Sequence, residues 1–161
     1  MASGKRIGKK SQASNDFLEP LAPTGVTGTD VGTGRAFNNG AVSVAFSLPA
    51  LSPAATSYTV TASTGQTATG ASSPIIVTGI ASTATPTFTV TATNAAGTSA
   101  ASAASAAVTV TTVPATMAAP TATAGVDSDT VSWTAPNNGG SAISTYSWTS
   151  SDGKSGSTSA T

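Results

Sequence analysis

Apolar and polar residues alternate along much of the chain between residues 41 and 112. In the run AVSVAFSL (41–48), Val42, Val44 and Phe46 fall on one face, and the residues between them are serine or alanine. A period of two residues is typical of strands that bury one face and leave the other in solvent. The pattern predicts strands over residues 41–48, 56–63, 74–80, 87–94 and 106–112.

Segments that contain glycine, asparagine or proline separate these runs, at residues 38–40, 63–66, 70–74 and 94–99. Glycine and asparagine reach the positive φ values that hairpin loops need. Short strands joined in this way predict an all-β fold, an antiparallel β-sandwich. A helix over the alanine-rich residues 95–107 is the alternative. The interspersed serines, Gly97 and the run VTVTT that follows favour a segment without a helix.

A second unit begins after the segment VPATMAAP (113–120), in which two prolines mark a linker and the start of a strand. The runs DTVSWTAP (129–136) and ISTYSWTS (143–150) then repeat the earlier strand pattern. We therefore expect a first module over 21–112, a linker over 113–119 and the start of a second module over 120–161.

The spacing of aromatic residues supports this duplication. Phe46 precedes Tyr58 by 12 residues, and Trp133 precedes Tyr146 by 13. A glycine follows each of the two tyrosines after seven residues. The first unit is longer than the second before its first aromatic residue, and we assign the excess to a loop insertion at 28–40.

These runs resemble a fibronectin type III domain. The stretch DTVSWTAPNNGGSAISTYSW is similar to the first half of such a module, with Trp133 at the position of the core tryptophan. The stretch FTVTATNAAGTSAAS (88–102) is similar to the second half. Phe46 replaces the core tryptophan in the first unit, and Phe88 replaces a tyrosine whose hydroxyl bonds to the backbone in that family. Together with the alternation, the resemblance implies a core that contains Phe46, Tyr58, Phe88, Val90, Trp133 and Tyr146.

The second unit contains the strands of only half a sandwich. Trp133 and Trp148 would lack the second sheet that buries them, and an antiparallel half-sheet of this kind is not stable alone. We expect either that the chain is a fragment of a longer polypeptide or that another subunit completes the unit.

Charge is concentrated at the start of the chain, although the formal net charge is zero and only 7% of residues are charged. Residues 1–20 lack a hydrophobic period and hold four of the six basic residues, so we expect a basic, extended arm. Its only sizeable apolar pair is Phe17 and Leu18. The side chains that we expect to anchor the arm to a partner are Lys5, Arg6, Lys9, Lys10, Phe17 and Leu18.

Several chemistries are disfavoured by the residues present. The chain has no cysteine and no histidine, which removes disulfides, thiolate metal sites and the commonest general base. Gly4 and Gly8 do not have the spacing of a phosphate-binding loop. Asp127 and Asp129 are too few for a calcium site, and the aromatic residues fall at core positions rather than on a sugar-binding platform. We predict no enzymatic activity, no cofactor and no bound metal.

The basic start is followed by SQASNDFLEP rather than by the apolar run of an export signal, and no stretch is apolar enough to span a membrane. Threonine- and alanine-rich tandem modules without cysteine resemble those on virion proteins of tailed bacteriophages. The resemblance implies a structural protein of the head, neck or tail, assembled in the host cytoplasm, whose arm binds a neighbouring virion subunit.

We further expect several copies in each particle, as a homo-oligomer or as separate chains, and a possible role of the distal modules in contact with the host surface. Nucleic acid is a less favoured partner for the arm, because no aromatic residue lies among its bases. The alternative function is a spacer or adhesion module of a bacterial cell-surface or secreted protein.

Overall fold

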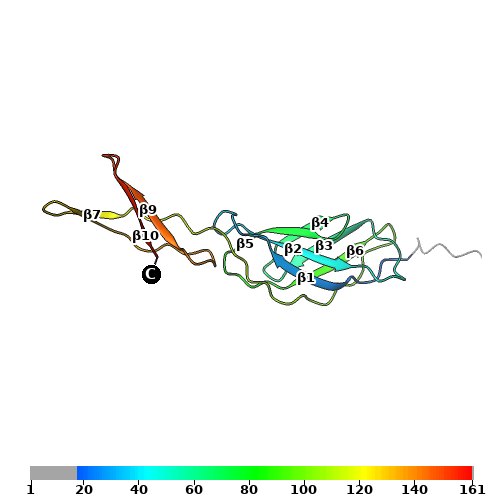
Figure 1. Ribbon diagram of the computed structural model, residues 1–161. Helices are drawn as coiled ribbons and strands as arrows, with labels where there is room; N and C mark the ends of the chain where they lie inside the picture. The colour runs from blue at the N-terminus through cyan, green and yellow to red at the C-terminus, as the bar shows by residue number, and fades with distance from the viewer. Residues whose placement is uncertain (1–17, 161) are drawn as a thin grey trace, which may run out of the picture.

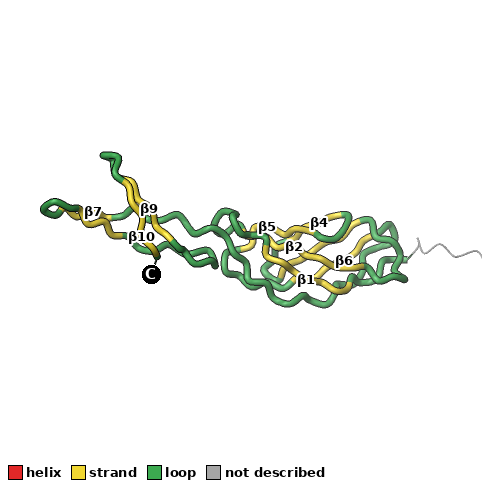
Figure 2. The backbone as a smooth tube through the Cα atoms, in the orientation of Figure 1, coloured by secondary structure: helices red, strands yellow, loops and turns green. Residues whose placement is uncertain are grey.

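The computed structural model describes residues 18–160, which form an all-β structure without helices (Figure 1, Figure 2). Every pair of neighbouring strands is antiparallel. The strands are β1 (Thr24–Asp30), β2 (Gly40–Ser47), β3 (Ser57–Ala62), β4 (Thr67–Gly70), β5 (Ile75–Ile80), β6 (Phe88–Thr93), β7 (Thr121–Ala124), β8 (Asp129–Ser132), β9 (Thr145–Thr149) and β10 (Ser155–Ser159).

The first six strands form two three-stranded sheets, in the orders β1-β2-β5 and β4-β3-β6. The two sheets enclose one apolar core, as in a β-sandwich, and we call this part the sandwich. Val42 and Val44 of β2 are buried together with Val60 of β3 and Val90 of β6, because alternate residues of each strand point inward. The buried core residues are Val42, Val44, Phe46, Val60, Ala62, Ile75, Val77, Ile80, Phe88, Val90 and Val110.

Four of the predicted strands match β2, β3, β5 and β6 to within one residue at each end. The predicted strand over 106–112 is wrong, because that segment has no regular strand structure. Its valines still pack on the core, since Val110 is buried and Val108 contacts the core cluster. The alternative helix over 95–107 is also not formed.

A three-residue repeat, SAASAASAAV (99–108), runs along the outer edge of β6 in place of a regular strand. The N–H groups of Ser99, Ser102 and Ser105 donate to the carbonyls of alternate residues of β6, at 2.8–2.9 Å. Each serine Oγ accepts the N–H of the same β6 residue, at 2.9–3.0 Å. One serine therefore satisfies both main-chain groups of one β6 residue. We call this arrangement the serine ladder.

The ladder is incompatible with ordinary strand geometry. Three of its residues run beside two residues of β6, which cover about 6.6 Å, so the segment rises only about 2.2 Å per residue. The spare hydroxyl hydrogens donate to the carbonyls of the following alanines, at 2.7–2.8 Å. The free edge of β6 is thereby closed without a regular strand, which prevents pairing with a foreign strand.

The predicted insertion at 28–40 is partly wrong, because Gly28 to Asp30 complete β1 and the loop begins only after them. A Cβ on Gly28 would lie 2.7 Å from Val108 Cγ2, so this strand position requires glycine. The Asp30 carboxylate accepts hydrogen bonds from the N–H of Gly32, at 3.0 Å, and from the N–H of Thr111, at 3.1 Å. Asp30 thus fastens the loop to the end of the sandwich.

Residues 120–160 form two separate hairpins, β7-β8 and β9-β10, which we call the two-hairpin unit. The turn between β9 and β10 is tight and polar, as the Ser-Asp-Gly sequence before β10 favours. Gly153 in this turn has φ 84°, and Gly65 in the β3-β4 turn has φ 97°. In both turns the glycine N–H donates to the carbonyl of the residue three positions earlier, at 3.0 and 2.9 Å. The seven-residue spacing from tyrosine to glycine therefore gives the same turn twice.

Candidate functional site

The described residues offer three surfaces for contact. The first is the amino-terminal pole of the sandwich, where the chain arrives from the arm (Figure 1). Asn94 Nδ2 donates to the carbonyl of Leu18 at 2.8 Å. The N–H of Leu21 donates to Ser52 Oγ at 2.9 Å. These bonds tie the incoming chain to two loops of the sandwich.

Most of the predicted anchoring residues of the arm, Lys5, Arg6, Lys9, Lys10 and Phe17, lie outside the described residues. Leu18 is described, and its side chain is 60% exposed at the amino-terminal pole. Sequence reasoning missed Leu51, which is 87% exposed at the same pole. The signal was present in LPALSP (48–53), where prolines flank an aliphatic residue between two strands.

The second surface is the opposite, carboxy-terminal pole, where the sandwich meets the two-hairpin unit. The N–H of Thr112 donates to the carbonyl of Gly139 at 2.8 Å, and the N–H of Ala115 donates to that of Asn137 at 2.9 Å. Gly139 is buried there with φ 68°. A Cβ at this position would lie 2.5 Å from the carbonyl oxygen of Val113, so only glycine allows this contact. Backbone hydrogen bonds therefore hold the sandwich and the two-hairpin unit together at this joint.

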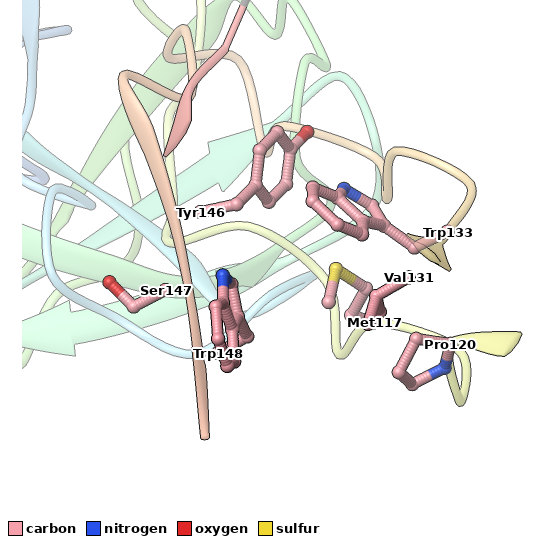
Figure 3. A pocket seen from close by; sticks show the side chains of 7 residues that line it. All are labelled: Met117, Pro120, Val131, Trp133, Tyr146, Ser147 and Trp148. Carbon is pink, nitrogen blue, oxygen red and sulfur yellow. The ribbon is translucent and has the colours of Figure 1, made fainter. Parts of the chain in front are cut away.

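The third surface is the inner side of the two-hairpin unit, where aromatic residues from both hairpins meet (Figure 3). The rings of Trp133 and Tyr146 pack with centroids 5.4 Å apart, and Met117 lies beside them. The cavity between these side chains measures only about 30 Å³. Ligand pockets are roughly tenfold larger, so the cavity holds no organic ligand. Both rings are partly buried.

Trp148 lines the same small cavity and is 40% exposed. Its ring covers Gly156 on the neighbouring strand, where a Cβ would come within 2.7 Å of the indole. Beyond it, an open cleft of about 480 Å³ between the hairpins is lined by Asp129, Asp152 and Lys154 among others. One wall of the cleft is therefore aromatic, and its rim carries charged side chains of both signs.

The charged groups of the β9-β10 turn interact with one another. Lys154 Nζ lies 3.3 Å from Asp152 Oδ2, and the Ser150 hydroxyl donates to the same carboxylate. The Ser150 hydrogen bond, followed by the Lys154 contact, lowers the pKa of Asp152 below its ordinary value of 3.8. Because Asp152 is solvated, this shift reflects local turn geometry and not an activated group.

The residues predicted to form the core divide between the two parts. Phe88 and Val90 are fully buried in the sandwich, Phe46 is nearly so, and Tyr58 packs against the same cluster. The rings of Phe46 and Tyr58 are 4.9 Å apart and tilted by 52°, which matches the Trp133 and Tyr146 pair at 5.4 Å and 57°. Equivalent aromatic contacts therefore recur in both units.

Within residues 18–160, no three acidic, cysteine or histidine side chains gather as metal ligands would. The same part of the chain contains no helix with the length and apolarity needed to cross a membrane. No protein-family model matches the chain, and no curated protein is significantly similar to it.

Proposed function

We propose that this chain is a non-enzymatic structural virion protein of a tailed bacteriophage, in the head, the neck or a tail appendage. The basic arm, residues 1–20, anchors it to a neighbouring virion subunit. Fibronectin type III-like modules project outward from that anchor, the first over residues 21–112 and the first half of another over 120–161. The protein is assembled in the host cytoplasm and is present in several copies per particle.

One observation carries this proposal: the chain reaches the sandwich at one pole and leaves it at the other (Figure 1). Hydrogen bonds tie Leu18 and Leu21 to the amino-terminal pole, and others fix Thr112 and Ala115 at the carboxy-terminal pole. A module with this path separates what lies before it from what lies after it by its full length. That is the geometry of a spacer.

The repeated contacts support the finer assignment to fibronectin type III-like modules. The two aromatic pairs and the two glycine turns occupy equivalent positions of the units. The fold retains the hydrophobic role of the family's core residues, although Phe88 lacks the hydroxyl of the tyrosine that it replaces. The serine ladder stands where a last regular strand would pair with β6.

The chemistry of the chain supports a structural role. A chain without histidine and cysteine lacks the usual groups for general-base and thiolate catalysis. The outward-facing positions of β3 and β6 are threonine and serine, half-buried except for Thr61, which suit a solvated or packed surface better than a reactive one. Under this proposal, contact with a host surface is made by the distal hairpins.

The test is to follow the full chain through a density gradient of phage particles. We expect it to co-sediment with particles at a fixed number of copies, measured by quantitative mass spectrometry. A chain that is absent from particles would contradict the proposal. If the chain is instead found in the bacterial envelope or in the medium, the alternative of a surface or secreted spacer module is favoured.

A further inference from the structure

Three exposed leucines gather at the amino-terminal pole of the sandwich, and we call them the leucine pole. Leu18, Leu21 and Leu51 are 60%, 49% and 87% exposed. Single exposed aliphatic residues are ordinary, whereas a group of them indicates an interaction surface. The hydrogen bonds of Leu21 to Ser52, and of Leu18 to Asn94, hold the three residues at one end of the molecule.

Leu51 is presented by a rigid turn. The N–H of Ser52 donates to the carbonyl of Pro49 at 2.9 Å, which closes a β-turn around Leu51. Ser52 Oγ donates to the carbonyl of Pro53 at 3.0 Å while it accepts the N–H of Leu21. The exposure of Leu51 is therefore built into an ordered loop, and docking would cost little ordering entropy.

The two-hairpin unit shows what a loop at this position contacts. Gly139 precedes Tyr146 by seven residues, as Leu51 precedes Tyr58. The loop that contains Gly139 is seated on the body that precedes it in the chain, through its bonds to Thr112 and Ala115. By the same placement, the loop of Leu51 faces whatever body precedes the sandwich. The arm leads into the sandwich at this pole, and under the proposed function it binds a virion subunit, so that subunit is the body that the loop of Leu51 faces.

The chemistry of the two loops differs. The Gly139 loop offers backbone carbonyls, whereas the loop of Leu51 offers an aliphatic side chain flanked by prolines. Glu19 is exposed beside the leucines, and its carboxylate lies 3.1 Å from the position that a Cβ on Gly97 would take. A complementary surface therefore has an apolar pocket with a basic side chain at its rim.

We propose that the leucine pole docks into such a pocket on the same protein that receives the arm, with Leu51 as the central anchor. This inference rests on the proposed function, in which the arm binds a virion subunit. It adds a second, rigid contact to the arm, and that contact sets the direction in which the modules project.

The experiment compares virions assembled in cells that supply the wild-type chain, Leu51→Asp or the matched control Val126→Asp. Val126 is 91% exposed in the β7-β8 turn, far from the leucine pole. Copies per purified particle are measured by quantitative mass spectrometry. Loss of a central anchor commonly weakens binding about tenfold or more. We expect Leu51→Asp to lower the copy number by at least that factor when the chain is limiting, and Val126→Asp to leave it unchanged.

Equal copy numbers for Leu51→Asp and wild type would overturn the inference and leave the proposed function standing. A wild-type chain that is absent from particles would overturn the proposed function, and this inference with it. An equal loss for Val126→Asp would also overturn the inference, since the effect would then not belong to this pole. The thermal unfolding midpoint of Leu51→Asp, expected to equal that of wild type, confirms that the variant folds.

Discussion

Replacing Ser102 by alanine removes the middle rung of the serine ladder. Ser102 Oγ accepts the N–H of Val90 at 2.9 Å and donates to the carbonyl of Ala103 at 2.8 Å. Val90 is fully buried, so its N–H would lose its partner without gaining water. A buried unsatisfied donor costs about 1–3 kcal/mol. The carbonyl of Ala103 is near the surface and regains a hydrogen bond from water, so its loss adds little to the cost of the substitution.

We therefore expect Ser102→Ala to lower the free energy of unfolding by about 2 kcal/mol, which corresponds to a fall of roughly 8–16 °C in Tm for a domain of this size. Thermal and urea unfolding measure the loss, and amide exchange at Val90 should accelerate more than at other core residues. The matched control is Ala103→Ser, on the exposed side of the same segment, with an effect within about 0.5 kcal/mol. A Ser102→Ala variant as stable as the control would refute the ladder as a source of stability.

Three further predictions concern other parts of the molecule. Gly139→Ala should loosen the joint between the sandwich and the two-hairpin unit, because its Cβ would meet the carbonyl oxygen of Val113 at 2.5 Å; small-angle scattering should then show a broader distribution of shapes. The control is Gly153→Ala, because Gly153 also has a positive φ, 84°, but has open space around it; this variant should leave the distribution of shapes unchanged. Phe88→Ala should cost about 3–5 kcal/mol in urea unfolding, since Phe88 is fully buried; a cost below 1 kcal/mol would contradict the core assignment. The lowered pKa of Asp152 stabilises the β9-β10 turn above pH 3.8, and this contribution is lost as the pH falls through the lower folded value; Ser150→Ala should raise that pKa toward 3.8 in an NMR titration, and an unchanged pKa would exclude the hydroxyl as its main cause.

Strands β2, β3, β5 and β6 could be predicted because burial of one face imposes a visible alternation. The alternation of Val42, Val44 and Phe46 predicts β2, and that of Phe88 and Val90 predicts β6. The edge strands β1, β4 and β10 were missed, and only the start of β7 after Pro120 was predicted, since threonine, glycine and serine carry no apolar period there. Edge strands are specified by their neighbours rather than by their own pattern.

The serine ladder shows a different limit. The segment 106–112 reads as a strand because Val108 and Val110 alternate, and their N–H groups do donate to the carbonyls of Pro86 and Ala84. These partners precede β6, however, and the repeat that runs beside β6 advances three residues for every two of that strand. Serine hydroxyls substitute for main-chain acceptors, and a search for strand and helix periods does not detect such substitution. The repeat itself was visible in the sequence as SAASAASAAV.

The surfaces were predicted less well than the core. The sequence drew attention to the basic arm, whereas Leu51 looked like one residue of an ordinary loop. The position of Leu51 at the amino-terminal pole follows from the hydrogen bond between Ser52 and Leu21, which are 31 positions apart in the chain. Contacts of this separation depend on how the sheets pack, which local pattern does not encode.

The central claim is that the basic arm attaches this chain to a virion. The most direct measurement is the number of copies per purified particle for the intact chain and for a chain that lacks residues 2–17, which leaves the sandwich and the leucine pole intact. We predict that the truncated chain is lost from particles, or falls at least about tenfold in copy number, as expected when four basic side chains and Phe17 are removed together. Incorporation of the truncated chain at the copy number of the intact one would contradict the account.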